Sequence, residues 1–340
     1  MKKVLVTGAG GYIGCVLVPM LLEKGYKVRA LDRYYFGREL LMNNENIETV
    51  YEDIRRIKPE HFADIDYVID LAALSNDPSG ELFQNATWQI NHIARVNVAN
   101  LAKQCGVQRY ILPSSCSIYG FQEEGVIADE NSQTNPLTTY ARANLRAENG
   151  TLPLADDKFS VIVLRQATVY GYSSRMRFDI AINGMSYGAW KDGVLPLMRD
   201  GSQWRPMVHV RDTAAAMCFM LEADVEKING EIFNVGSEEN NYQLKPLAEK
   251  VAEAVPRDVT IEWYGDPDHR SYRVSFNKIE SLGYKARYVA EDGVREICEA
   301  LENGALEKTD KTITLKWYQE LVKWNQIINQ VQLEGKIIDL

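Results

Sequence analysis

The feature that most constrains the fold is an alternation of short apolar runs with longer amphipathic segments through the first half of the chain. The runs have the length and the β-branched composition of buried strands; they are Lys3–Thr7, Lys27–Leu31, Asp66–Leu71, Arg109–Pro113 and Ser160–Arg165. The segments between them have helical periodicity and span Gly11–Gly25, Glu81–Gln104 and Thr139–Leu154. Strands that alternate with helices form a parallel sheet covered on both faces. The sequence therefore predicts an α/β fold built on a doubly wound parallel sheet.

The second half of the chain lacks this regular alternation, because Gly, Pro and aromatic residues interrupt it after Gly171. We expect residues 1–171 to form one domain, with about residues 205–237 returning to it. Within the returning segment, Gly230–Val235 has the composition of one more strand of the first sheet. A smaller, mixed C-terminal substrate domain would then comprise residues 172–204 and 238–340.

A long amphipathic segment predicts a final helix over about Thr312–Val331. Its large apolar side chains recur at helical spacing; they are Trp317, Leu321, Trp324, Ile328 and Val331. A stripe of this kind more often packs on its own domain than on a partner. We therefore expect this helix to cap the smaller domain.

The charge of the chain limits its partners. Its 38 basic and 47 acidic side chains give a formal net charge of -9, and no basic run stands out. Most of such a surface repels nucleic acid, so we exclude that partner. An anionic ligand would need local hydrogen-bond donors and arginines.

The cysteines and the apolar runs indicate the compartment. The five cysteines are scattered without paired spacing, which argues against a metal site or a disulfide framework and fits a reducing cytoplasm. The N-terminal apolar run is too short for a signal peptide, and glycine interrupts it. No stretch approaches the roughly 18 apolar residues that span a bilayer. We expect a cytoplasmic protein without a membrane partner.

A glycine-rich turn follows the first predicted strand and opens the first predicted helix. Gly8, Gly11 and Gly14 let this turn close, let the backbone approach a pyrophosphate and let the helix pack on the strand. Tyr12 and Ile13 lie between the last two glycines, at a helix N-terminus whose unpaired N–H groups favour phosphates. The turn therefore predicts a dinucleotide site in a Rossmann-type sheet.

The end of the second predicted strand indicates which dinucleotide binds. Asp32 is placed to accept hydrogen bonds from both ribose hydroxyls of an adenosine, and its charge would repel a 2′-phosphate. This favours NAD over NADP. Arg33 beside it leaves the second cofactor open, since an arginine could pair with a 2′-phosphate.

Two further segments carry a family resemblance. Ser114–Gly120 lies at the carboxyl end of the strand Arg109–Pro113, where open α/β sheets bind ligands, and Tyr140–Asn144 begins the next helix. With the glycine turn, they resemble the extended short-chain dehydrogenase/reductases of the nucleotide-sugar epimerase/dehydratase group, over nearly the whole chain. The resemblance implies an NAD cofactor. It extends to further segments expected at the cofactor: Asp53, Ile54, Leu71, Ala72, Ala73 and Asn91.

The resemblance assigns a catalytic pair. Ser115 matches the Ser or Thr that hydrogen-bonds the reacting hydroxyl, and Tyr140 matches the tyrosine that removes its proton as hydride leaves for the nicotinamide. A phenol with a pKa of about 10 is a poor base at neutral pH, so the site must stabilise its phenolate.

Asn144 is the main departure from the family pattern, since the motif has a lysine there to supply charge and hold the nicotinamide ribose. Asparagine can still bind the ribose, but it carries no charge. Arg142 and Arg146 do not share the helix face of Tyr140 well. Three explanations are open: a natural variant that uses the charge of the oxidised nicotinamide, an engineered inactivation, or lost catalysis.

The residues after Ser115 narrow the reaction. The family's dehydratases have an Asp-Glu-like pair there, whereas this chain has Cys116 and Ser117, which cannot replace a carboxylic acid. We expect Cys116 to serve packing rather than acid catalysis. The prediction is NAD-dependent oxidation of a ring hydroxyl, at C4, of a nucleotide-sugar, by a 4-epimerase or a 4-dehydrogenase. The alternative is a catalytically weakened or non-catalytic protein that binds NAD or a nucleotide-sugar.

Arginines cluster in the stretches that bind substrate in the family, and arginine suits bidentate phosphate contacts. The segments Arg175–Asp179 and Arg205–Asp212 and the run from Asp268 to Arg273 supply them. The predicted substrate-binding residues are Ser117, Thr168, Arg177, Asn183, Arg205, Arg270 and Arg273. We expect His209 to be structural. The resemblance also implies a homodimer formed through the helices at Glu81–Gln104 and Thr139–Leu154.

Overall fold

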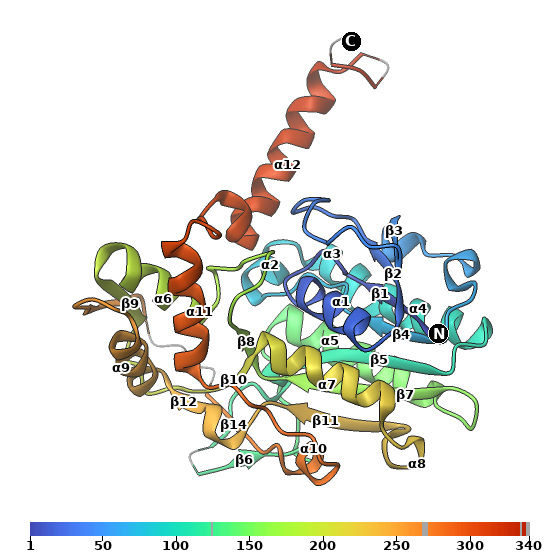
Figure 1. Ribbon diagram of the computed structural model, residues 1–340, viewed down its shortest axis with the longest axis horizontal. Helices are drawn as coiled ribbons and strands as arrows, with labels where there is room; N and C mark the ends of the chain where they lie inside the picture. The colour runs from blue at the N-terminus through green and yellow to red at the C-terminus, as the bar shows by residue number, and fades with distance from the viewer. Residues whose placement is uncertain (124, 267–270, 334, 338–340) are drawn as a thin grey trace.

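The computed structural model describes residues 1–123, 125–266, 271–333 and 335–337. Its centre is a parallel sheet of seven strands in the order β11-β7-β5-β4-β1-β2-β3 (Figure 1). The strands are β1 (Lys3–Thr7), β2 (Lys27–Asp32), β3 (Ile47–Tyr51), β4 (Tyr67–Asp70), β5 (Arg109–Ser115), β7 (Ser160–Gln166) and β11 (Glu231–Val235). All six pairings are parallel. The predicted α/β class and the return of a strand at Gly230–Val235 are confirmed.

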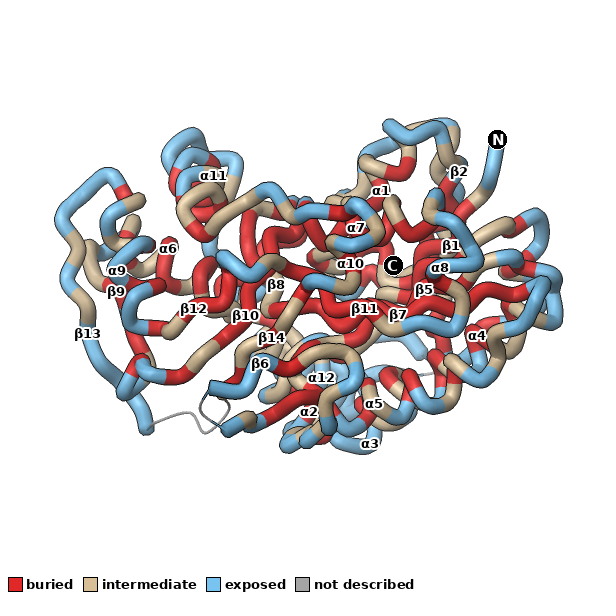
Figure 2. The backbone as a smooth tube through the Cα atoms, turned by 90° about the horizontal axis from the view of Figure 1, so that it is seen from below, coloured by how far each residue is buried: buried red, intermediate tan, exposed pale blue. Residues whose placement is uncertain are grey.

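Helices cover both faces of this sheet, because successive strand residues point to opposite faces and both faces are apolar. On one face, Val4 and Val6 pack with α1 (Gly14–Glu23) and α7 (Val210–Glu222). On the other, Leu5 packs with α4 (Arg95–Gln104) and α5 (Thr139–Thr151). Figure 2 shows the strands as a buried band inside an exposed periphery.

The helix expected over Glu81–Gln104 is not continuous. It consists of α2 (Asp77–Leu82), α3 (Gln84–Trp88), a π-helical turn at Gln89–Ala94, and α4. Phe83 leaves helical geometry, with φ −119° and ψ 51°, and ends α2. Single π-turns often mark functional positions. This one carries Asn91, whose amide side chain exchanges two hydrogen bonds with the backbone of Leu74.

A smaller lobe lies beside the carboxyl ends of the strands (Figure 1). Its core brings together side chains from three helices and a parallel strand pair. These elements are α6 (Ala181–Asp192), α9 (Leu244–Ala254), α11 (Ala290–Glu302), β9 (Val194–Met198) and β13 (Thr260–Tyr264). Between the lobes run β8 (Thr168–Tyr170), β10 (Trp204–His209) and β12 (Asn241–Gln243), which form a three-stranded sheet. The remaining short elements are β6 (Ile127–Ala128), β14 (Arg273–Val274), α8 (Val225–Ile228) and α10 (Asn277–Ser281).

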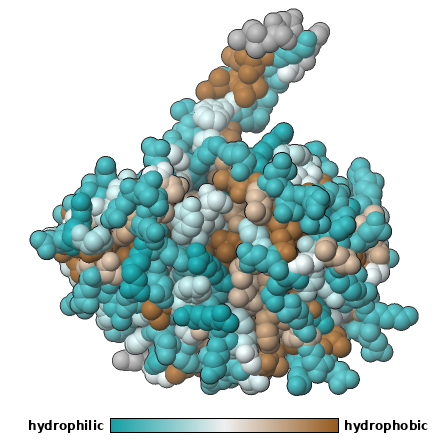
Figure 3. Space-filling view, in the orientation of Figure 1, coloured by the Kyte–Doolittle hydropathy of each residue, from teal (hydrophilic) through white to brown (hydrophobic). Residues whose placement is uncertain are grey.

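The last helix, α12 (Thr314–Val331), forms where the sequence predicts it, but it does not cap the smaller lobe. It projects from the molecule, and apolar side chains gather along its distal part (Figures 1 and 3). Trp324 and Val331 are 47% and 56% exposed. Its base instead contacts the first lobe, where the indole of Trp317 donates a hydrogen bond to the carbonyl of Tyr35. Among the described helices, none is long and apolar enough to cross a bilayer.

Candidate active site

A cavity of about 710 Å³ opens at the carboxyl ends of the central strands and reaches the smaller lobe. Open parallel sheets bind ligands at this edge. Most of the residues predicted from the sequence line it: Gly8, Gly11, Tyr12, Ile13, Gly14, Asp32, Arg33, Asp53, Ile54, Leu71, Ala72, Ala73, Ser115, Ser117, Tyr140, Thr168, Arg177 and Arg205. The candidate cofactor, catalytic and substrate residues therefore share one cavity.

Two glycines of the turn occupy positions where any side chain would collide with neighbouring backbone. Gly8 has φ +67°, and a Cβ there would lie 2.7 Å from the backbone nitrogen of Ala72. A Cβ on Gly14 would lie 2.4 Å from the carbonyl oxygen of Ala9. These two glycines therefore let the turn pack against the loop after β4 and against itself. Gly8, Gly11 and Gly14 line the cavity beside the start of α1, where a pyrophosphate can approach N–H groups. This cradle fits a dinucleotide.

Asp32 ends β2 at the wall of the same cavity. Its two carboxylate oxygens accept hydrogen bonds from the amides of Gly10 (3.0 Å) and Tyr34 (2.7 Å), which fix their orientation. Each oxygen keeps a second lone pair for a ribose hydroxyl. Arg33 forms an ion pair with Asp53, 3.0 Å from Nη1 to Oδ2. An arginine paired in this way is not positioned as a 2′-phosphate receptor, which favours NAD.

The carboxylate of Asp53 accepts hydrogen bonds from two arginines. Arg55 donates to it from its amide (2.9 Å) and from its guanidinium (2.9 and 2.6 Å), and Arg33 adds a further contact. Burial alone would raise the pKa of this carboxyl, but these hydrogen bonds and charges lower it to about 2. Asp53 is therefore an anion in the cofactor half of the cavity.

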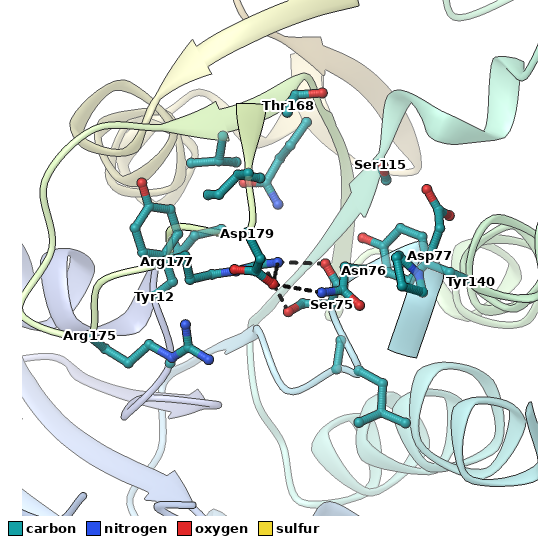
Figure 4. A pocket seen from close by; sticks show the side chains of 18 of the residues that line it. Tyr12, Ser75, Asn76, Asp77, Ser115, Tyr140, Thr168, Arg175, Arg177 and Asp179 are labelled. Carbon is teal, nitrogen blue, oxygen red and sulfur yellow. Dashed lines mark hydrogen bonds and ion pairs between the residues drawn. The ribbon is translucent and has the colours of Figure 1, made fainter. Parts of the chain in front are cut away.

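Ser115 and Tyr140 lie on one side of the cavity (Figure 4). The hydroxyl of Ser115, at the end of β5, accepts a hydrogen bond from the amide of Ser117 (3.1 Å), and it lies near enough to the Tyr140 phenol to lower the pKa of that phenol. Gly80 allows α2 to approach closely, because a Cβ there would lie 3.1 Å from that of Tyr140. The predicted catalytic pair is thus brought together by β5, α2 and α5.

The surroundings of Tyr140 disfavour its charged form. Burial raises the pKa of the phenol, and the carboxylate of Asp77 raises it further. Arg95, the neighbouring Ser115 hydroxyl and Arg177 act in the opposite direction, but the net pKa stays above its ordinary value of 10. A proton-abstracting role therefore requires added positive charge near the phenol.

Asn144 does not line the cavity. Its side chain is buried, accepts a hydrogen bond from Arg95 (3.0 Å) and donates one to the backbone carbonyl of Tyr140 (3.1 Å). The side-chain amide of Asn144 is therefore already hydrogen-bonded within the protein. The sequence pointed to this position but not to Arg95, its partner.

Two buried arginines line the wall opposite Tyr140 (Figure 4). Arg177 forms a bidentate pair with Asp179 at 3.0 Å. Asn76 donates to the same carboxylate, so the loop after β4 is tied to the loop after β8. In the described part of the chain, Arg175 makes no ion pair; it donates to Thr314 (3.0 Å). Burial and then the charge of Arg177 lower the pKa of Arg175 to about 10.

The other predicted substrate residues divide into two groups. Ser117, Thr168 and Arg205 line the cavity, and the Ser117 hydroxyl is buried without a hydrogen-bond partner, so a ligand could satisfy it. Asn183 and Arg273 are outside the lining. Asn183 instead joins the Gly171 amide to the Tyr12 hydroxyl, and the Arg273 guanidinium stacks over Trp204 at 4.7 Å. Arg270 lies outside the described residues.

Asn91 is also outside the lining, where it orders the backbone at Leu74 rather than facing the cavity. The expectations for Cys116 and His209 are confirmed. Cys116 is buried, and its thiol donates to the carbonyl of Arg165. His209 is buried with Nε2 3.1 Å from Glu296, and its Nδ1 accepts from the Arg211 amide at the start of α7. Both side chains serve the fold.

The residues that sequence reasoning missed are polar groups contributed by loops: Ser75, Asn76 and Asp77 after β4, and Tyr318 on α12. The run Ser75-Asn76-Asp77-Pro78 directly after a predicted strand was an available signal. Asn76 caps α2, since its side chain accepts from the Ser79 amide. Tyr318 carried no signal, because only the fold brings α12 to this cavity.

Comparisons with known proteins agree with this geometry. The model of a family described as "NAD dependent epimerase/dehydratase family" matches residues 4–236. UDP-glucose 4-epimerase 2 of Arabidopsis thaliana is 26% identical over 342 residues, which cover 89% of this chain and 95% of the relative. UDP-glucuronic acid decarboxylase 1 of the same plant is 24% identical over 323 residues (91% and 72%). The solved structure of MoeE5 in complex with UDP-glucuronic acid and NAD is 25% identical, with a TM-score of 0.79 over 89% of this chain and 100% of that one.

Proposed function

Because the chain belongs to the NAD dependent epimerase/dehydratase family and NAD is therefore its cofactor, we propose that it oxidises the C4 hydroxyl of a nucleotide-sugar. The proposal rests on the position of Ser115 and Tyr140 in the same cavity as the glycine turn and Asp32. A UDP-sugar is the first candidate, since relatives and the MoeE5 complex are named for UDP-sugars.

In this proposal, each residue of the pair has one task. Tyr140 takes the proton of the C4 hydroxyl, and Ser115 hydrogen-bonds the same oxygen and holds it in line. When bound, NAD would supply the acceptor for the hydride from C4 and a positive charge that favours the phenolate. The sugar leaves oxidised by two electrons, as a 4-ketone, or takes the hydride back on its other face as an epimer.

We assign the cofactor to the part of the cavity that the glycine turn and Asp32 line. Asp32 accepts from the adenosine ribose, the start of α1 faces the pyrophosphate, and Arg175 adds a guanidinium nearby. Arg205 lines the same cavity, and we assign it to the substrate diphosphate. Arg177, paired with Asp179, orders the wall beside it.

The test is a panel of UDP-sugars supplied to the NAD-loaded protein, with absorbance followed at 340 nm and products identified by mass spectrometry and NMR. Steady growth of absorbance with a 4-keto product identifies a dehydrogenase, and a C4 epimer without net NADH identifies an epimerase. The comparison variant is Tyr140→Phe, which should abolish both. Binding of NAD and sugar with no product from any sugar would overturn the proposal and favour a non-catalytic binding protein.

A further inference from the structure

One buried cation in the NAD-binding half plays no part in the function described so far. Arg95 begins α4, and its side chain is 1% exposed. It occupies the first position of the buried stripe that continues with Val98, Ala99 and Ala102. A buried guanidinium is costly unless its charge is balanced and its N–H groups are hydrogen-bonded. For packing alone, an apolar side chain would be more favourable here.

The contacts of Arg95 join the elements that carry the catalytic pair. Its Nη2 donates to the carbonyls of Asp70 in β4 (2.7 Å) and Pro113 in β5 (2.5 Å). Its Nη1 donates to Oδ1 of Asn144 in α5 at 3.0 Å. The carboxylate of Asp70 lies 3.8 Å from Nε. Arg95 is thus fixed between the strand that ends at Ser115 and the helix that begins at Tyr140.

Asn144 is the link between this cation and the first turn of α5. It follows Tyr140 by one helical turn, and its Nδ2 donates to the Tyr140 carbonyl. A lysine in its place would put an ammonium beside the Arg95 guanidinium, and two buried like charges disfavour each other. The amide of asparagine instead offers the acceptor that the guanidinium needs.

We propose that Arg95 and Asn144 together replace the motif lysine: Asn144 anchors the guanidinium near the start of α5, and its charge stabilises the phenolate of Tyr140. The proposal rests on the proposed function, in which Tyr140 takes a proton. Arg95 is a positioning residue here, because its charge acts through Asn144 and through the low-dielectric interior without touching the sugar.

The charges that face Tyr140 agree with this. On α2, Asp77 raises the pKa of the phenol, and Glu81 contacts the amide that precedes Tyr140. Arg95 from α4 and Arg177 from the loop after β8 lower it. Arg177 is already neutralised by a bidentate carboxylate, whereas Arg95 meets Asp70 only at 3.8 Å. Among the described residues, Arg95 is therefore the cation that most favours the charged form of the phenol.

The experiment measures single-turnover hydride transfer at 340 nm against pH, with the holoprotein and the sugar that the panel identifies. For Arg95→Met, we expect hydride transfer at pH 7 to slow about tenfold. We also expect the acid limb of the pH–rate profile, where the rate falls as Tyr140 is protonated, to move up by about one pH unit. The rate should recover at high pH, where the phenol ionises without help. A uniform loss at every pH would indicate a structural role and overturn the proposal.

The second part of the experiment moves the positive charge from position 95 to position 144. Asn144→Lys alone should slow transfer, because it opposes Arg95. The double variant Arg95→Met/Asn144→Lys should return the acid limb to within a few tenths of a unit of the wild-type position. A faster Asn144→Lys single variant, or a double variant with the limb still displaced, contradicts the proposal. Arg146→Met, which removes an exposed arginine from the same helix, should leave the limb in place.

A readout without sugar separates this inference from the proposed function. In protein labelled with ¹³Cζ-tyrosine, NMR titration follows the Tyr140 phenol, assigned by its absence in Tyr140→Phe. Its pKa should rise in Arg95→Met with or without NAD. If the pKa of Tyr140 rises in Arg95→Met but the wild type converts no sugar, only the proposed function is overturned. If the wild type transfers hydride but the pKa of Tyr140 is the same in Arg95→Met, only the proposed role of Arg95 is overturned.

Discussion

At the scale of single residues, Arg175 is a buried cation on the cavity wall, and we propose that it contacts a cofactor phosphate. Its guanidinium is buried, lines the cavity and stacks 3.5 Å from the centre of the Phe36 ring. Because a buried cation binds an anion strongly, Arg175→Met should weaken NAD binding about tenfold. Isothermal titration of NAD checks this, with the exposed Arg56→Met as control. Equal losses in both variants would argue against a specific contact.

The acid limit of stability should depend on Asp53. The folded pKa of this carboxyl is about 2, below its ordinary value of 3.8, so its contribution is complete above pH 4 and is lost as pH falls toward 2. The difference amounts to about 2 kcal/mol. The urea midpoints of wild type and Asp53→Asn should therefore differ at pH 5 and converge near pH 2. A gap that stays constant with pH would contradict this.

Residue by residue, the sequence predicted best where one backbone constraint decides the outcome. Gly8 and Gly14 are fixed by steric contacts that glycine alone tolerates, so a motif finds them. The sequence singled out Asn144 as a departure from the family motif but not its partner Arg95. Arg95 lies in phase with Val98 and Ala102, which was a usable signal, but an arginine near a helix start usually indicates a solvated position.

At the scale of elements, α5 depends on a buried ion pair. Glu148 on α5 and Arg165 on β7 are 1% and 4% exposed and meet at 2.8 Å, and Ser114 donates to the same carboxylate. Glu148→Leu leaves the guanidinium unpaired and should lower the free energy of unfolding by about 3–5 kcal/mol. The double variant Glu148→Leu/Arg165→Met should recover most of this loss in urea denaturation. No recovery would mean that the carboxylate acts mainly through Ser114.

The strands of the sheet were predictable because buried parallel strands are continuous apolar runs. β3 was missed, since Ile47–Tyr51 lies at the sheet edge and is mostly exposed. The break at Phe83 and the π-turn were missed because they depend on tertiary contacts such as the Asn91 bonds to Leu74. The exposure of α12 was likewise invisible, because periodicity identifies an apolar stripe but not what covers it.

At the scale of the whole molecule, the predicted family is confirmed by the family match over residues 4–236. The predicted division into domains and the predicted dimer stay predictions. For the dimer we propose the face around α2 and the π-turn, where Leu82 and Ile93 are 52% and 50% exposed. The proposal follows from the family resemblance, which implies a dimer formed through these helices.

Sedimentation velocity tests this face. Ile93→Arg should convert a micromolar dimer to a monomer, because a charge would be buried in the interface. The matched control is Val322→Arg on α12, 43% exposed, which should leave the dimer intact. A wild-type monomer, or dissociation by the control alone, would exclude this interface.

We propose that Tyr140 and Ser115 promote the transfer of a hydride from C4 of the sugar to NAD. The most direct measurement supplies a UDP-sugar deuterated only at C4 and follows a single turnover by absorbance and by mass spectrometry of the cofactor. We predict a slower single turnover with the deuterated sugar in either reaction. A dehydrogenase leaves a reduced cofactor one mass unit heavier, whereas an epimerase returns the deuterium to C4 of the epimer after a transient rise at 340 nm, and Tyr140→Phe shows none of these signals. Equal rates with the deuterated and the unlabelled sugar, or full activity in Tyr140→Phe, would contradict this.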